Sequence, residues 1–437
     1  MLNLLAAPAL ATLLALPAAS ASPKPSPALA PLDAAYPELE AFYVDLHRSP
    51  ELSMQEEKTS AKIAQRLRAL GYDVTERVGG FGVVGVMRNG KGPTVLLRAD
   101  MDALPVLERT GLPYASTVTA KDASGATVPV MHACGHDIHM TSLVGAAGLL
   151  AKAKARWKGT LVVVGQPAEE LGGGASKMLK DGFLERFPRP DFAISFHDDP
   201  RMPAGQVGFT PGFVFANVDS VDITVFGRGG HGARPEASVD PVVIAARIVT
   251  ALQTVVSREN SPFDPAVVTV GSIHGGTKHN IIPDEVKMQL TVRSYKREVR
   301  DKLLAAVERI AKAEAAAAGA PRVPEVKHAD GGDAVYNDPV LTKRVAGALT
   351  AALGASSVRE MPPIMAGEDF GDIGKAAKCP SLILWVGLTA PEKLAAVGGD
   401  VNRVPSLHSS EMAPVPAPTI KAGVSALTVA ALEVLRR

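Results

Sequence analysis

The sequence predicts an α/β protein in which a small ferredoxin-like domain is inserted into a larger α/β domain. Two apolar runs, 161–164 and 192–196, have the length and composition of strands that are buried on both faces of a sheet. Between residues 218 and 329 the pattern changes to a compact series of shorter segments. The chain of 437 residues, 46% hydrophobic and 21% charged, is long enough to bury a core in each of two domains.

The inserted segment follows the order β-α-β-β-α-β, which is typical of a ferredoxin-like domain. The expected elements are a strand at 218–226, a helix at 239–256, strands at 266–274 and 285–295, a helix at 297–318 and a closing strand at 323–327. We place the inserted domain at 216–329. The larger domain is then divided into residues 32–215 and 330–437.

The first 21 residues have the composition of a secretory signal peptide. They are apolar and Ala-rich, and Ala19-Ser20-Ala21 offers small residues for cleavage before a Pro-rich linker at 22–31. We therefore expect an exported protein, either periplasmic or secreted. An uncleaved membrane anchor is the alternative, because Met1-Leu2-Asn3 carries no Lys or Arg.

The charges of the chain are balanced, with 46 Lys and Arg against 45 Asp and Glu and a net charge of +1. The sequence has no basic tail and no cluster of basic and aromatic residues. A nucleic acid is therefore not an expected partner.

The segment Met131–His139 holds one of the two cysteines and three of the ten histidines. Cys134 and His136 are two residues apart on a Gly-containing turn, so a thiolate and an imidazole can face one ion of zinc or a similar metal. On spacing alone, a buried cysteine beside a capping histidine is the alternative. Further ligands must come from elsewhere in the chain.

Carboxylates and histidines follow both apolar runs, at the strand ends where open α/β sheets place their sites. Glu169 and Glu170 follow the first run, and His197 follows the second. Neighbouring side chains leave an extended backbone in different directions, so one Glu can bind metal while the other reaches a water molecule. His408, in a polar loop near the C-terminus, is a further candidate. Taken singly, each histidine is more often structural, but the whole set indicates a metal site.

Seven motifs, in this order along the chain, resemble those of a family of metal-dependent amidohydrolases. They are Leu46–Leu52, Leu97–Pro105, the Cys134-Gly135-His136 segment, Glu169-Glu170, Gly229-Gly230-His231, Asn280–Pro283 and Gly367–Phe370. The family includes hippurate hydrolase, bacterial N-acyl-amino-acid amidohydrolases and the plant auxin-conjugate hydrolases, and the resemblance is to its branch with a cysteine ligand. It implies a zinc-peptidase-like catalytic domain with a central mixed sheet, to which the inserted domain adds a lid.

The resemblance also implies the roles of the candidate residues. The ligands of one or two divalent ions would be Cys134, His136, Glu170, His197 and His408. Glu169 would be the general base, and Asp102 would hold a ligand in place, whereas the role of Asp100 stays open. Zinc or manganese is the expected ion, with cobalt and nickel as alternatives. A disulfide between Cys134 and Cys379 would exclude a metal-bound thiolate, and we expect Cys379 to be a buried free thiol.

In the lid, His231 would stabilise the developing oxyanion. In the family such a histidine reaches the site of a neighbouring subunit, so a homodimer through the lid is expected. Without the resemblance, the Gly-rich turn at His231 is a loop or a phosphate-binding turn. Relatives often carry a second histidine where this chain has Glu236. Asn280, Arg293 and Gly367 would contact the substrate; for Arg293 the alternative is a solvated surface charge.

The activity that the resemblance implies is hydrolysis of the amide bond of an N-acyl amino acid, a small molecule, to a carboxylic acid and an amino acid. A dipeptidase or carboxypeptidase that uses the same ions is the first alternative. A protein that binds a metal or a ligand without catalysis is the second. Glu169 counts against the second alternative, because a binding protein has no use for a general base.

Overall fold

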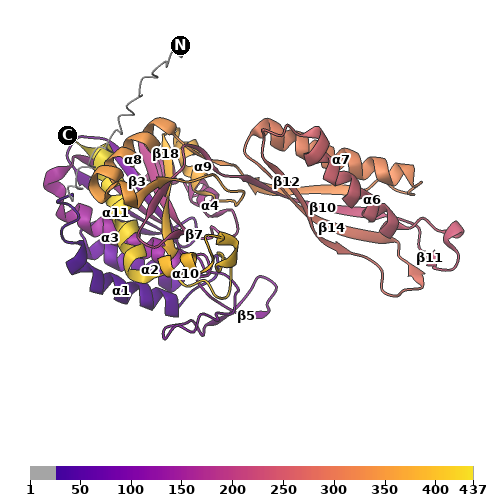
Figure 1. The fold of residues 1–437 in the computed structure, drawn as a ribbon, viewed down its shortest axis with the longest axis horizontal. Helices are drawn as coiled ribbons and strands as arrows, with labels where there is room; N and C mark the ends of the chain where they lie inside the picture. Colours follow the sequence, from indigo (N-terminus) through magenta and orange to yellow (C-terminus); the bar gives the residue numbers. More distant parts are fainter. Residues whose placement is uncertain (1–25, 437) are drawn as a thin grey trace, which may run out of the picture.

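The computed structural model describes residues 26–436, without the side chain of residue 330. It consists of an α/β domain and an elongated lid domain that extends away from it (Figure 1). The lid is formed by the middle of the chain and the α/β domain by the segments on either side. The predicted α/β architecture with an α+β insert is therefore confirmed. The expected signal peptide, 1–21, lies outside the described residues.

Within the described residues, an eight-stranded mixed sheet forms the centre of the α/β domain. In spatial order its strands are β1 (Asp73–Val78), β2 (Gly82–Asn89), β6 (Gly159–Gln166), β3 (Thr94–Asp100), β7 (Phe192–Pro203), β18 (Ser381–Thr389), β8 (Val207–Phe209) and β17 (Val358–Glu360). The four strands β6, β3, β7 and β18 are parallel. Their carboxyl ends therefore meet at one edge of the sheet, where α/β proteins bind ligands.

Helices cover both faces of this sheet. One face packs against α1 (Leu32–Arg48), α2 (Glu57–Ala69), α3 (His136–Lys152), α8 (Pro339–Leu353) and α11 (Pro416–Leu435), and the other against α4 (Gly174–Lys180), α5 (Phe183–Arg186) and α9 (Phe370–Ala377). Along β6, Leu161 and Val163 join the first core, whereas Val162 and Val164 join the second. Burial of both faces explains why this strand is a continuous apolar run.

The lid is a four-stranded antiparallel sheet with two helices on one face. Its strands, in spatial order, are β12 (Ala266–His274), β14 (Glu285–Ser294), β10 (Asn217–Phe226) and β15 (Glu325–Gly332), and its helices are α6 (Pro241–Thr254) and α7 (Arg297–Ala317). Along β10, the alternating residues Val221, Ile223 and Val225 are buried in the core under the helices. This arrangement is the predicted ferredoxin-like one, with a longer closing strand than expected.

Short elements complete the chain. Three pairs of short strands are the hairpin β4 (Thr119–Lys121) and β5 (Thr127–Pro129), the pair β9 (Gly212–Phe215) and β16 (Val335–Asn337), and the pair β11 (Gly230–His231) and β13 (Ile281–Ile282). The short helical elements include α10 (Pro391–Ala396) and a π-helical turn at Val255–Glu259 after α6. The pair β9–β16 lies where the chain enters and leaves the lid. The pair β11–β13 lies at the opposite, outer end of the lid (Figure 1).

Candidate metal centre

The turn that carries Cys134 and His136 lies at the start of α3 and is buried. Gly135 has a φ of +78°, and a Cβ atom at this position would clash with the carboxylate of Asp198. Glycine is therefore required between the two candidate ligands. His136 Nδ1 donates to the carbonyl oxygen of Asp102 at 2.8 Å, which leaves the lone pair of Nε2 free for a metal ion.

The other candidate ligands come from the end of β6, from the interior of β7 and from a C-terminal loop, so His197 does not lie at a strand end as expected. Glu169 and Glu170 follow the end of β6, and His197 lies within β7. The loop before α11 supplies His408, whose φ is +65° and whose backbone N–H donates to the carbonyl oxygen of Ala133 at 2.7 Å. This backbone contact fixes the loop next to the Cys134 turn.

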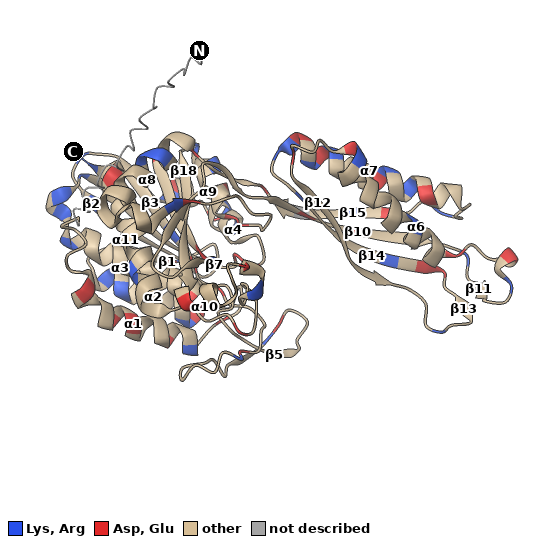
Figure 2. Cartoon of the chain, viewed as in Figure 1, with Lys and Arg blue, Asp and Glu red and all other residues tan. Residues whose placement is uncertain are grey.

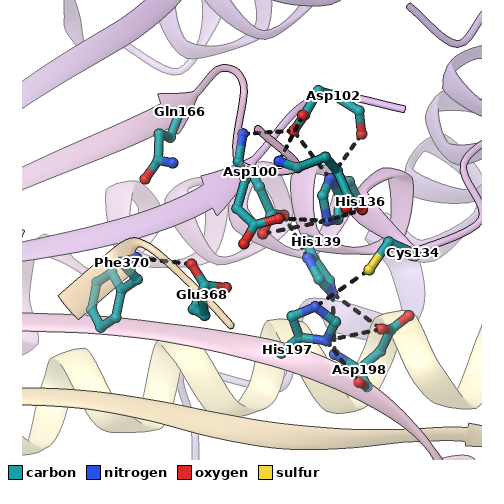
Figure 3. Close-up of polar contacts among 12 residues, drawn as sticks. Asp100, Asp102, Cys134, His136, His139, Gln166, His197, Asp198, Glu368 and Phe370 are labelled. Atoms are coloured by element: carbon teal, nitrogen blue, oxygen red, sulfur yellow. Dashed lines mark hydrogen bonds and ion pairs between the residues drawn. The ribbon is translucent and has the colours of Figure 1, made fainter. Parts of the chain in front are cut away.

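Five donor atoms converge at this place, from Cys134, His136, Glu170, His197 and His408. His408 Nε2 lies 3.3 Å from Cys134 Sγ and 3.4 Å from Glu170 Oε1. His197 Nε2 lies 3.6 Å from the same sulfur (Figure 3). With metal–ligand bonds of the usual length, donors around one tetrahedral zinc ion lie about 3.3–3.8 Å apart. These separations therefore match those of a metal site.

The donors form two groups of three that share one atom. Cys134 groups with His136 and His197 on one side, and with Glu170 and His408 on the other. The sulfur thus lies between two sets of ligands. These two groups of residues would hold two divalent ions, or one ion in either group.

Among the described residues, two of the donor atoms have no hydrogen-bond partner that would take the place of a cation. His136 Nε2 and Glu170 Oε1 are buried, and within residues 26–436 neither has a hydrogen-bond partner. Burial and the carboxylates of Glu170 and Glu169 raise the pKa of the Cys134 thiol well above its usual range. A divalent ion would satisfy the two free atoms and stabilise the thiolate. One or two divalent ions therefore fit these residues.

His139 lies beside the centre but is not available as a ligand. Its Nδ1 donates to Asp100 Oδ1 at 2.6 Å, and its Nε2 accepts the backbone N–H of Asp198 at 3.1 Å (Figure 3). Both ring nitrogens are thus occupied. Asp100, whose role the sequence left open, orients His139 and lies 3.6 Å from His136 Nε2.

Asp102 lies directly behind the ligands. Its carboxylate accepts the backbone N–H groups of Glu169 at 3.1 Å and Glu170 at 3.0 Å. Its carbonyl oxygen holds His136, as described above. Asp102 therefore orients Glu170 through its backbone N–H and His136 through its ring Nδ1, one ligand from each donor group.

A buried arginine network behind the centre was not predicted. Arg98 is fully buried and contacts Asp100 at 2.8 Å, Glu368 at 2.8 Å and Asp369 at 3.1 Å. Its Nε donates to Gln166 at 2.9 Å. The available signal was a single arginine inside an apolar strand, because a buried charge of this kind requires buried partners.

Glu169 lies beside the donors, with Oε2 4.0 Å from His136 Nε2. Burial and the neighbouring carboxylates of Glu368 and Glu170 raise its pKa well above the usual range. A carboxyl group with a raised pKa is suited to accept and return a proton near neutral pH. This position agrees with a general base.

A cleft of about 870 Å³ lies over the donors, between the α/β domain and the base of the lid. Arg293 and Gly367 line this cleft together with Cys134 and Glu169. Arg293 is half-buried, and its Nη1 donates to the carbonyl oxygen of Met365 at 2.7 Å. Within the described part of the chain it has no carboxylate partner, so its charge is available to a ligand.

The structure does not bring His231 and Asn280 to this cleft. Both are exposed at the outer end of the lid, where Asn280 accepts the backbone N–H of Gly232 at 2.9 Å. Figure 1 shows this end, marked by β11, far from the α/β domain. Within one chain, the two residues are therefore remote from the metal donors.

Comparisons with known proteins agree with this geometry. The model of peptidase family M20/M25/M40 matches residues 96–397. The chain is 35% identical over 384 residues to an N-acetylcysteine deacetylase of Bacillus subtilis, covering 86% of this chain and 96% of the relative. It is 41% identical over 264 residues to a hippurate hydrolase of Campylobacter jejuni, covering 60% of this chain and 66% of the relative. A solved structure of a dinuclear metal-binding peptidase of the M20 family from Bacillus subtilis matches with a TM-score of 0.73 and 30% identity, over 92% of this chain and 99% of that one.

Proposed function

Because the chain belongs to peptidase family M20/M25/M40 and is a metal-dependent amidohydrolase of this family, we propose that its substrates are N-acyl amino acids. The products are a carboxylic acid and a free amino acid. One observation carries the proposal: five atoms that could ligate a metal converge beside Glu169, in a cleft that also contains Arg293, which has no carboxylate partner within residues 26–436. The deacetylase and the hippurate hydrolase named above supply the comparison for this substrate class.

Neighbouring residues have different roles in the proposed reaction. Cys134, His136, Glu170, His197 and His408 would hold one or two divalent ions. A bound divalent ion polarises the amide carbonyl and lowers the pKa of a water molecule towards about 7. Glu169 accepts the proton of the attacking water and then donates it to the leaving nitrogen.

Arg293 gives the cleft its preference for an acidic substrate. The α-carboxylate of an N-acyl amino acid can accept hydrogen bonds from the guanidinium group. Gly367 lines the cleft nearby, and a side chain at this position would press against Val218. A glycine here keeps the backbone close to the substrate.

The oxyanion donor would come from a second copy of the chain. His231 is remote from the metal donors of its own chain, whereas β12 forms an open edge of the lid sheet. In Figure 2 many positions along α7 are coloured as Lys, Arg, Asp or Glu, whereas α6 has few such positions. On and near α6 and β12, Val242, Val243 and Phe263 are exposed, Phe263 to 91%. We therefore propose a homodimer through the lid, which brings His231 and Asn280 to the partner's cleft.

Amino-acid release tests the proposed activity. Purified protein without metal, and the same protein loaded with Zn²⁺ or Mn²⁺, is incubated with N-acetyl, N-benzoyl and longer N-acyl amino acids and with dipeptides. Metal-dependent release from the N-acyl substrates is the expected result. Release from dipeptides alone would replace the proposal with a dipeptidase, and no release with any metal would favour a protein that only binds.

Export of the protein is also a proposal, and only the sequence supports it. Cleavage after Ala21 would leave Ser22 as the first residue. N-terminal sequencing of the protein from an expressing bacterium tests this directly. A chain that still begins at Met1 in the membrane fraction would indicate the uncleaved anchor instead.

A further inference from the structure

The turn that carries the two glutamates has a strained backbone. Ala168 is fully buried and has a φ of +52°, the left-handed region that residues with a side chain rarely adopt. This conformation turns the chain at the end of β6, directly before Glu169 and Glu170. Surrounding contacts must therefore hold Ala168 in place.

Buried carboxylates hold three successive backbone N–H groups of this turn. Asp102 accepts those of Glu169 and Glu170, as described for the metal centre. The third, from Ala168, donates to Glu56 Oε1 at 2.8 Å. Glu56 is fully buried and directly precedes α2. It is distant from Ala168 in the sequence, and its carboxylate reaches the strained residue itself.

The loop that contains Glu56 supports the turn from two sides. Ser53 in the same loop donates its hydroxyl to Asp102 Oδ2 at 2.6 Å. The loop is in turn fixed to the segment that follows β3, because Ala103 N–H donates to the carbonyl oxygen of Glu51 at 2.8 Å. One short loop thus supplies the carboxylate of Glu56 and contacts that of Asp102, and these two carboxylates hold the turn.

We infer that Glu56 is a positioning residue, whose hydrogen bond to Ala168 keeps the turn left-handed and thereby directs Glu169 and Glu170 towards the metal donors. The inference rests on the proposed roles of Glu169 as base and Glu170 as ligand. Glu56 itself is not one of the five donors and does not line the cleft. Its effect on the reaction passes entirely through the backbone of the turn.

Three single variants and one double variant separate positioning from a general loss of stability. E56A removes the acceptor, and E56Q keeps an oxygen that can accept the same N–H group. The double variant E56A/A168G also changes the strained residue to one that adopts a positive φ freely. E57A is the matched control, because Glu57 is the neighbouring glutamate, is exposed and, among the described residues, forms an ion pair only with Arg77, at 3.5 Å.

Two readouts are measured for each variant: Zn²⁺ affinity by calorimetry, and kcat and KM for an N-acyl amino acid. A misplaced catalytic group costs about a hundredfold in rate, so E56A should lower kcat by about this factor and weaken Zn²⁺ binding, with little change in KM. E56Q and E57A should resemble the wild type. In the double variant E56A/A168G, the turn no longer needs the hydrogen bond, and kcat should be about tenfold higher than in E56A.

Wild-type Zn²⁺ affinity and kcat in folded E56A would overturn the inference. So would a double variant that is no better than E56A, because the strain at Ala168 would then be irrelevant. If the wild-type protein binds Zn²⁺ but hydrolyses no N-acyl substrate, the proposed function fails. The comparison of Zn²⁺ affinities among the variants still decides the role of Glu56 in that case.

Discussion

Cys134 Sγ lies 3.3 Å from His408 Nε2, although the two residues are 274 positions apart in the chain. A backbone hydrogen bond holds the two residues together, because His408 N–H donates to the carbonyl oxygen of Ala133. The second part of the α/β domain therefore completes a centre that the first part begins. The lid is inserted between these two parts, and the cleft lies at its base.

Removal of Cys134 should affect both donor groups, since its sulfur belongs to each. We expect C134A to bind Zn²⁺ at least about a hundredfold more weakly and to lose turnover, because a thiolate is a strong zinc ligand. Metal content after dialysis, measured by mass spectrometry, checks this. C379A is the matched control, because Cys379 is the other free cysteine and lies outside the centre. Equal metal content in C134A and C379A would contradict the proposed centre.

Arg293 should determine the preference for a substrate carboxylate. A charged hydrogen bond contributes about 1.5–3 kcal/mol, so R293A should raise KM by roughly ten- to a hundredfold. An N-acyl amino acid amide, which lacks the carboxylate, should show little difference between R293A and the wild type. R201A is the control, because Arg201 lines the same cleft but is paired with Asp199 at 2.6 Å. An equal effect of R293A on both substrates would exclude a contact with the carboxylate.

The local parts of the centre could be predicted from the sequence. Cys134 and His136 are close in the chain, and Glu169 and His197 are close to apolar runs that predict buried strands. Position at a strand end is a local signal, and sheet topology converts it into proximity. The assignment of His408 to the same centre came from the resemblance to a known family, because no local pattern in the sequence links His408 to these residues.

The supporting residues were harder to predict because their partners are distant. Arg98 meets Glu368 and Asp369, some 270 positions later, and Glu56 meets Ala168. A charged residue in a helix cap or an apolar strand does not reveal which segment will pack against it. The expected position of His231 likewise depends on a second chain, which the sequence of one chain does not place.

His47 should make the stability of the protein depend on pH. Burial alone would lower its pKa, but hydrogen bonds with Asp137 at 2.6 Å and Glu108 at 3.1 Å raise the pKa to about 9. The folded protein thus holds the proton more tightly than the unfolded chain, where the pKa is about 6.5. The contribution, roughly 3 kcal/mol, is complete below about pH 6.5 and is lost as the pH rises through about 9.

Urea unfolding of the metal-loaded protein at several pH values tests the role of His47. The wild type should lose stability between about pH 6.5 and about pH 9, whereas H47Q should be less stable at the lower pH and vary less. H328Q is the control, because His328 is exposed on the lid. The same pH dependence in H47Q and the wild type would show that His47 is not the group responsible.

Mixing two inactive variants tests whether His231 acts in the cleft of a partner. H231A and E169Q should each be nearly inactive alone. After exchange of subunits, a mixed dimer contains one cleft with both Glu169 and a partner His231, and about a quarter of wild-type activity should return if pairing is random. Light scattering should show a dimer. A mixture that stays inactive although subunits exchange, or a fully active monomer, would contradict the role in trans.

The most direct test of the account compares E169Q with the wild type after both are loaded with Zn²⁺ or Mn²⁺. The amide keeps the shape of the side chain but cannot accept the proton of water. We expect E169Q to keep the wild-type metal content and to lose about a hundred- to ten-thousandfold in kcat for N-acyl amino acids. Turnover by metal-loaded E169Q at the wild-type rate would contradict Glu169 as the general base and the mechanism built on it.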